Sequence, residues 1–166
     1  VIIITLLFFI NNFSQTYPDD TLAVRAVLDT NGLTAVPVKS VTDSSGGRII
    51  KLDLYRKSIT KIPAQIGNLT ALKALFLDQN SLSALPAEIS NLKALDTLDV
   101  KKNIISTLPA QIGDLTALKW LSAESNLLSA IPAEIGSLKQ LTSLYLRDNS
   151  ITALTSEIGK CSALKI

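Results

Sequence analysis

The sequence contains no histidine at all, and it contains a single cysteine among its 166 residues. Without histidine, serine or cysteine triads of the usual kind and most zinc sites are excluded. One cysteine allows no disulfide bond within the chain, so the fold must be stabilised by packing. No glycine-rich phosphate loop is present either, and the Gly46-Gly47 pair is typical of a turn. We therefore expect a protein that is not an enzyme and that needs no metal ion and no cofactor.

Clustered positive charge is also lacking. The 16 basic and 14 acidic residues give a net charge of +2, and no run of lysine or arginine is longer than two residues. Nucleic-acid binding draws on a basic patch or stripe that neutralises phosphates. The sequence therefore predicts no nucleic-acid partner.

Leucine, asparagine and proline instead recur with a period of 23 residues. Full copies of the unit begin at Leu69, Leu92, Leu115 and Leu138, and residues 46–68 fit the same frame with a weaker start. The shared pattern is L-x-x-L-x-L-x-x-N-x-L-x-x-L-P-x-x-I-x-x-L. A period of this length indicates a solenoid, in which each unit buries its apolar side only against its neighbours.

The fixed positions of the unit have physical reasons. The L-x-L pair alternates with a period of two, so Leu75 and Leu77 face inward and Phe76 faces outward. Where the chain leaves the strand, an amide side chain can donate and accept at once, and so satisfy the backbone above and below. A proline has no N–H, which suits an extended segment on the opposite, convex side. The expected structural asparagine ladder comprises Asn80, Asn103, Asn126 and Asn149, and the proline column comprises Pro63, Pro86, Pro109 and Pro132.

This pattern resembles the leucine-rich repeat family in its 23-residue form, with an L-P-x-x-I-G-x-L segment. The resemblance covers roughly residues 46–166. It implies an α/β solenoid: a curved right-handed coil with a parallel β-sheet on its concave side and an irregular or short-helical convex side. Residues 48–166 would supply five units and a truncated sixth.

Three positions depart from the repeat frame. Lys57 stands where the first unit should have asparagine, so that unit is expected at the end of the ladder. Thr155 replaces a proline, which should be tolerated, and Cys161 takes a leucine position and is expected to be buried. No polar unit closes the C-terminal end, so we expect the sequence to be part of a longer protein.

A hydrophobic leader is predicted at the N-terminus. Residues 1–10 are apolar except for Thr5, and mostly polar residues follow. The run is shorter than the about 20 residues of a membrane-spanning helix, and it suits the core of a signal peptide over residues 1–17. Such a leader would engage the membrane or the secretion machinery. A retained anchor and a buried strand or helix stay open as alternatives.

Residues 18–47 differ in composition from the repeats and predict a helix followed by a hairpin. Asp19 or Asp20 can cap a helix over about residues 21–30. A strand is expected over residues 36–42, before a cluster of turn residues. The segment is similar to the N-terminal cap of plant-type leucine-rich repeat receptors, although it lacks their cysteines. The alternative is an independent short domain.

The candidate binding residues lie on the outward positions of the predicted strands, where ligands commonly meet leucine-rich repeat proteins. Most aromatic residues of the repeats fall there, although leucine already fills the interior. Aromatic residues with polar neighbours are usual anchors of protein interfaces, and Trp120 with Tyr145 is the expected anchor pair. The alternative is that aromatic residues simply favour strands and shield the sheet. The predicted partner-binding residues are Tyr55, Phe76, Asp78, Asp99, Lys101, Trp120, Glu124, Tyr145 and Arg147.

Together these observations predict a non-catalytic recognition module that binds a protein or peptide through its concave sheet. The leader and the cap favour a secreted or cell-surface location, either periplasmic or extracellular. One alternative is an intracellular scaffold of the Ras-regulator-like leucine-rich repeat type in the cytoplasm, whose L-P-x-x-I-G-x-L segments look much like these. Another is the regulatory part of a longer receptor or enzyme.

Overall fold

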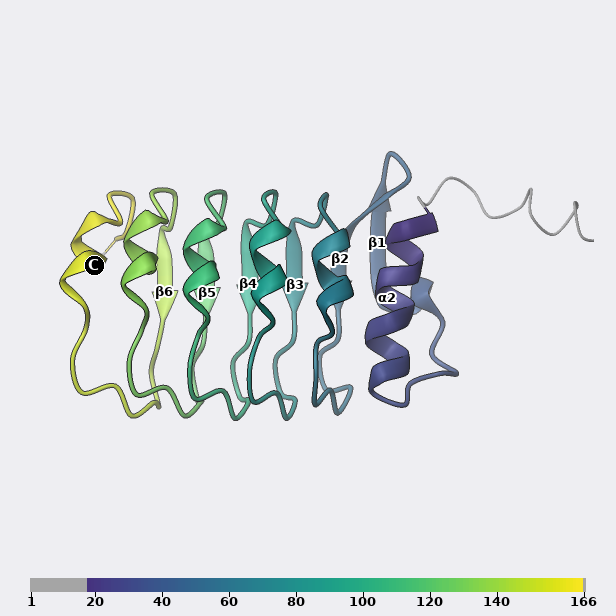
Figure 1. Cartoon of the computed structure of the whole chain (residues 1–166), viewed down its shortest axis with the longest axis horizontal. Helices are drawn as coiled ribbons and strands as arrows, with labels where there is room; N and C mark the ends of the chain where they lie inside the picture. Colours follow the sequence, from purple (N-terminus) through teal and green to yellow (C-terminus); the bar gives the residue numbers. More distant parts are fainter. Residues whose placement is uncertain (1–17, 166) are drawn as a thin grey trace, which may run out of the picture.

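The computed structural model describes residues 18–165, so the predicted leader over residues 1–17 lies outside the described residues. Between residues 18 and 165, six strands form one sheet in the order of the sequence, β1 to β6 (Figure 1). The same part of the chain contains no helix that is long and apolar enough to cross a membrane.

Five of the strands are parallel and repeat in register. Leu75 of β3 lies opposite Leu98 of β4, and Leu98 lies opposite Leu121 of β5, so each strand repeats the one before it after 23 residues. The edge strand β1 (Thr42–Ser45) is antiparallel to β2. The parallel strands are β2 (Arg48–Asp53), β3 (Ala74–Phe76), β4 (Thr97–Asp99), β5 (Trp120–Ser122) and β6 (Ser143–Tyr145).

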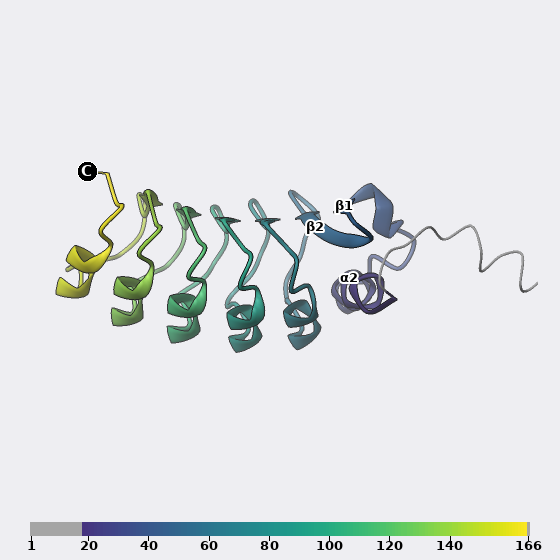
Figure 2. The same cartoon turned by 90° about the horizontal axis from the view of Figure 1, so that it is seen from above.

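Short 3₁₀ helices line the side opposite the sheet (Figure 2). At four of the five helices, a proline comes directly before the first helical residue, with φ between −75° and −66°. Proline suits this extended position because its ring fixes φ near these values. At the fifth, Thr155 replaces the proline, and its hydroxyl accepts the N–H of Glu157 at 3.3 Å. The helices are η2 (Ala64–Asn68), η3 (Ala87–Asn91), η4 (Ala110–Asp114), η5 (Ala133–Ser137) and η6 (Ser156–Lys160).

The inward leucines form one continuous core between these two layers. Leu75, Leu98 and Leu121 are fully buried, whereas Leu144 on the last strand is partly buried because no described strand packs beyond it. Cys161 is buried, as expected, and its thiol donates to the carbonyl of Ile135 at 3.1 Å. The predicted solenoid, with a parallel sheet and short helical turns opposite, is confirmed.

The first helix, α2 (Pro18–Thr30), begins earlier than expected. The prediction that Asp19 or Asp20 caps a helix starting near residue 21 is wrong, because both lie inside its first turn. Proline is favoured at the start of a helix, since its missing N–H would have no partner there. Asp20 is fully buried instead, and its carboxylate accepts from the Arg48 guanidinium at 2.9 Å and from the Ile49 N–H at 2.8 Å.

The segment between α2 and β2 also differs from the expectation. The predicted strand over residues 36–42 is wrong: a 3₁₀ turn, η1 (Val38–Ser40), precedes the edge strand β1. The turn at Gly46-Gly47 has φ values of 57° and 80°, which glycine adopts without strain. Residues 43–45, which the sequence predicts as part of the turn cluster, can therefore fold back with Thr42 as a strand onto β2.

Leu98→Ala should lower the free energy of unfolding by about 2–5 kcal/mol, because it removes a fully buried side chain and leaves a cavity. Leu127→Ala is the matched control: Leu127 is 57% exposed, and its loss should change stability by about 0.5 kcal/mol or less. Urea denaturation of both variants measures the difference. Equal stability losses would contradict the inward placement of Leu98.

Candidate binding face

The concave face is formed by the outward side chains of β2 to β6. The residue two positions after the end of each strand also contributes its side chain to this face. These strands lie along one long side of the solenoid, opposite the 3₁₀ helices (Figure 2). Because side chains alternate along a strand, the core leucines point to the other side of the sheet. Of the predicted residues, Tyr55 and Tyr145 are exposed, whereas Phe76 and Trp120 are half-buried.

The structure brings Trp120 and Tyr145 together. Their ring centroids lie 5.6 Å apart with an interplanar angle of 51°, a tilted aromatic pair that spans β5 and β6. Phe76 and Tyr55 lie apart from this pair, toward β2 and β3. The ammonium of Lys51 lies 5.5 Å from the Phe76 ring centroid, and the guanidinium of Arg56 lies 5.3 Å from that of Tyr55.

The acidic residues of the face are more enclosed than their outward positions suggest. Asp99 is 4% exposed and Asp78 is 8% exposed. The Asp99 carboxylate accepts the backbone N–H of Lys101 at 3.0 Å, and the Lys101 ammonium lies 3.6 Å from it. Burial, and then the charge of Asp99, raise the pKa of Asp78 above its ordinary value, while Lys101 opposes this rise. The surroundings of Asp78 therefore disfavour the ionised form of its carboxyl group.

The remaining predicted residues lie toward the C-terminal end of the face. Arg147 is exposed, and its guanidinium lies 3.4 Å from the carboxylate of Asp148. Glu124 is half-buried, and no cation of residues 18–165 lies within the 4.0 Å of an ion pair from its carboxylate. Glu124 and Asp78 thus flank Lys101 in neighbouring units without an ion pair of their own.

Sequence reasoning missed part of the site. An open hollow of about 340 Å³ lies over β2 and β3, and its lining includes residues that were not predicted to bind: Lys51, Asp53 and Gln79. Ser122 was missed as well, although it is 1% exposed and lies in register between Asp99 and Tyr145. Among buried side-chain nitrogen and oxygen atoms of the described chain, the Ser122 hydroxyl is the one without a hydrogen-bond partner.

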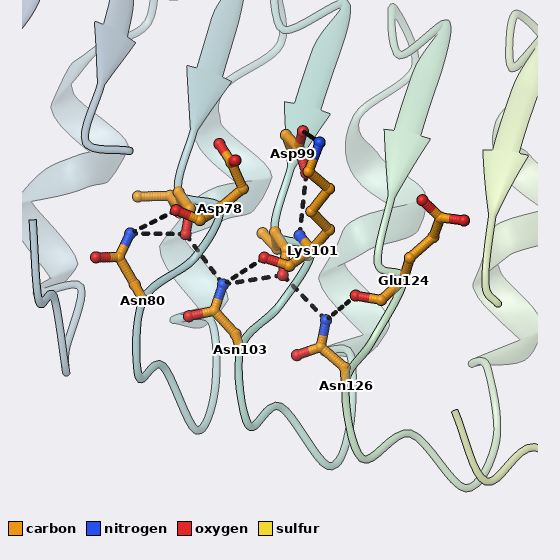
Figure 3. A network of polar contacts seen from close by, with 9 residues as sticks. Asp78, Asn80, Asp99, Lys101, Asn103, Glu124 and Asn126 are labelled. Atoms are coloured by element: carbon orange, nitrogen blue, oxygen red, sulfur yellow. Dashed lines mark hydrogen bonds and ion pairs between the residues drawn. The ribbon is translucent and has the colours of Figure 1, made fainter. Parts of the chain in front are cut away.

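The asparagine ladder holds the strand ends that carry this face (Figure 3). The amide group of Asn103 donates to the carbonyls of Val100 at 2.9 Å and of Leu77, in the preceding unit, at 3.0 Å. Its amide oxygen accepts the N–H of Leu82 at 2.9 Å. Asn80, Asn126 and Asn149 make the same set of bonds in their own units. Each ladder member therefore ties one strand end to the unit before it.

Within residues 18–165, no group of three or more Cys, Asp or Glu side chains is placed to hold a metal ion. The face offers the ring surface of Trp120 and Tyr145 and the unpartnered hydroxyl of Ser122.

Comparisons with known proteins agree with this geometry. A family model described as a leucine-rich repeat region matches residues 46–166. The leucine-rich repeat ectodomain of the receptor kinase SOBIR1 from Arabidopsis thaliana has a TM-score of 0.75 and 26% identity, covering 91% of this chain and 91% of its own. A leucine-rich repeat protein of Leptospira interrogans has a TM-score of 0.65 and 38% identity, covering 69% of this chain and 29% of its own.

A third similar structure was solved with its ligand. The plant peptide hormone receptor RGFR1, in complex with RGF2, has a TM-score of 0.57 and 35% identity, covering 63% of this chain and 18% of the receptor. The chain thus spans less than a third of the length of both the Leptospira protein and this receptor. Among curated proteins, no significant match was found.

Asp78→Asn should raise the melting temperature at neutral pH, because it removes a carboxylate whose ionised form is disfavoured by burial and by Asp99. Because the pKa of Asp78 is raised on folding, the penalty is present at neutral pH. It fades as the pH falls through that raised pKa, and it is gone below the unfolded value of about 3.9. The gain over the parent chain should therefore vanish in acid.

Asp114→Asn is the control for that measurement, since it removes the same charge from an exposed position on the helical side. Thermal melts of both variants from neutral to acid pH report the comparison. A lower melting temperature for Asp78→Asn than for the parent at neutral pH would contradict the account of this carboxylate.

Proposed function

The chain belongs to the leucine-rich repeat family, and from this premise we propose that it is a non-catalytic module that binds a protein or peptide on its concave face. The observation that carries the proposal is the Trp120–Tyr145 pair. The core below these rings is already filled by buried leucines such as Leu121, so the rings are not needed to close it. A large ring surface among polar neighbours is what hot spots of protein interfaces have in common.

The polar groups around the pair support the same proposal. A partner that covers the face can satisfy Glu124 and Asp78 with its own donors, and a buried carboxylate gains most from a charged donor. The complex of the similar plant peptide hormone receptor with RGF2 supports a peptide or protein ligand rather than a small molecule. The lack of histidine supports a function without catalysis.

We further propose that the protein is secreted or displayed at the cell surface. The signal-peptide-like run of residues 1–10 and the likeness to a receptor ectodomain support export. Expressed from its own coding sequence, the protein should lose this leader and start near residues 15–18, which mass spectrometry of the mature chain can establish. An intact leader on a cytosolic protein would contradict export and favour the intracellular scaffold.

A partner can first be isolated through its binding to the intact chain. Trp120→Ala should then weaken the binding of this partner by about 2 kcal/mol or more, a loss of roughly thirtyfold in affinity. Because the half-buried ring lies outside the core, the fold should change little. Ile104→Ala is the control, since Ile104 is 50% exposed and lies outside the strands. Calorimetric titration of each variant, after matched melting curves, measures the effect. Unchanged affinity for Trp120→Ala would remove Trp120 from the binding site.

A further inference from the structure

The concave face divides into two chemically different halves. Toward β3 and β4 it carries the enclosed carboxylates of Asp78 and Asp99, and toward β5 and β6 it carries the rings of Trp120 and Tyr145. A partner that matches both halves must present a cation to the first and a large apolar group to the second. Either half alone is a common surface feature, and their combination is what narrows the choice of partner.

The half of the face near β3 and β4, which we call the acidic half, has fewer cations than carboxylates. Lys101 is engaged by Asp99 through both its backbone N–H and its ammonium group. Asp78 is 8% exposed, and no cation of the described residues lies within ion-pair distance of its carboxylate. An enclosed carboxylate without a cation at ion-pair distance is unfavourable, because its own backbone N–H and the more distant Lys101 offset the lost hydration only in part. A lysine or arginine side chain from outside would supply the missing charge.

The aromatic half contains an independent sign of an absent ligand. The hydroxyl of Ser122 has no hydrogen-bond partner, and the residue is only 1% exposed. It belongs to the outward set of β5, in register between Asp99 and Tyr145 and two residues from Trp120. A buried polar group without a partner costs about 1–3 kcal/mol. A polar group of the ligand can supply the missing partner.

The distance between the two halves limits the ligand. Neighbouring strands are about 4.8 Å apart and residues along a strand about 3.3 Å apart. Asp78 lies two residues beyond the level of Ser122 and Tyr145 in the sheet, so it is about 16 Å from the ring pair on β5 and β6. An extended peptide advances about 3.3 Å per residue and points every second side chain to the same face. A cation and an apolar group that both face the sheet are then about four to six residues apart.

We propose that the concave face binds an extended peptide segment that crosses the strands, with a lysine or arginine against Asp78 and an aromatic or large aliphatic residue about four to six positions away on the Trp120–Tyr145 pair. The inference rests on the proposed function, and it adds the chemistry and the spacing of the ligand. The peptide makes no strand of the sheet, because its contacts are with outward side chains. Ser122 would pair with the peptide backbone between the two anchors.

The test is a selection from a random peptide library displayed on phage, with the whole chain immobilised. Enriched peptides should share a basic residue about four to six positions from an aromatic or large aliphatic one. For a synthetic copy of one enriched peptide, Asp78→Asn should lower the affinity by about tenfold or more, as expected for loss of an enclosed charge pair. Asp114→Asn, which removes an exposed carboxylate on the helical side, should leave the affinity unchanged.

The outcomes separate this inference from the wider proposal. Peptides that lose binding with Trp120→Ala but not with Asp78→Asn would overturn the cationic anchor and keep the concave face as the binding site. Equal effects of Asp78→Asn and Asp114→Asn would also overturn it, since the charge would then act only at long range. A selection that enriches no peptide would overturn the extended-peptide ligand and favour a folded protein partner. Peptides that bind every variant equally would refute the concave face itself.

Discussion

The hydrogen bonds of the stacked asparagine amides are the interaction on which the rest of the structure depends. Each unit must turn sharply after a strand of three residues, and that turn leaves buried carbonyl and N–H groups without strand partners. Asn103 satisfies carbonyls in its own unit and in the preceding one, and it accepts an N–H from the preceding unit as well. Because the same bonds recur every 23 residues, all units share one geometry.

This regularity separates the residues that hold the fold from those that are free to bind. Once the ladder and the inward leucines fix the stacking, an outward residue can be changed without altering the register of the strands. The face keeps features that do not serve stability, namely the enclosed charge of Asp78 and the unpaired hydroxyl of Ser122. Functional sites are where such local costs are expected to persist, because stability is supplied elsewhere.

The repeat and the ladder could be predicted because both follow from local alternation and a fixed period, as the buried Leu75 and the bonds of Asn80 illustrate. The pairing of Asp20 with Arg48 could not, since it joins residues 28 positions apart through side-chain conformations. The enclosure of Asp78 likewise depends on neighbouring units. The residue before each ladder asparagine has a positive φ, and because none of these residues is a glycine, the sequence does not indicate this conformation. They are Gln79, Lys102, Ser125 and Asp148.

Native-state amide hydrogen exchange tests the central role of the ladder most directly. The N–H groups of Leu82 and Ile105 each donate to a ladder amide oxygen, so they should exchange as slowly as the strand-end amides of Leu77 and Val100. Exchange at Leu82 and Ile105 as fast as at the exposed serines that follow them would show that the amides do not hold the turns, and it would contradict the account.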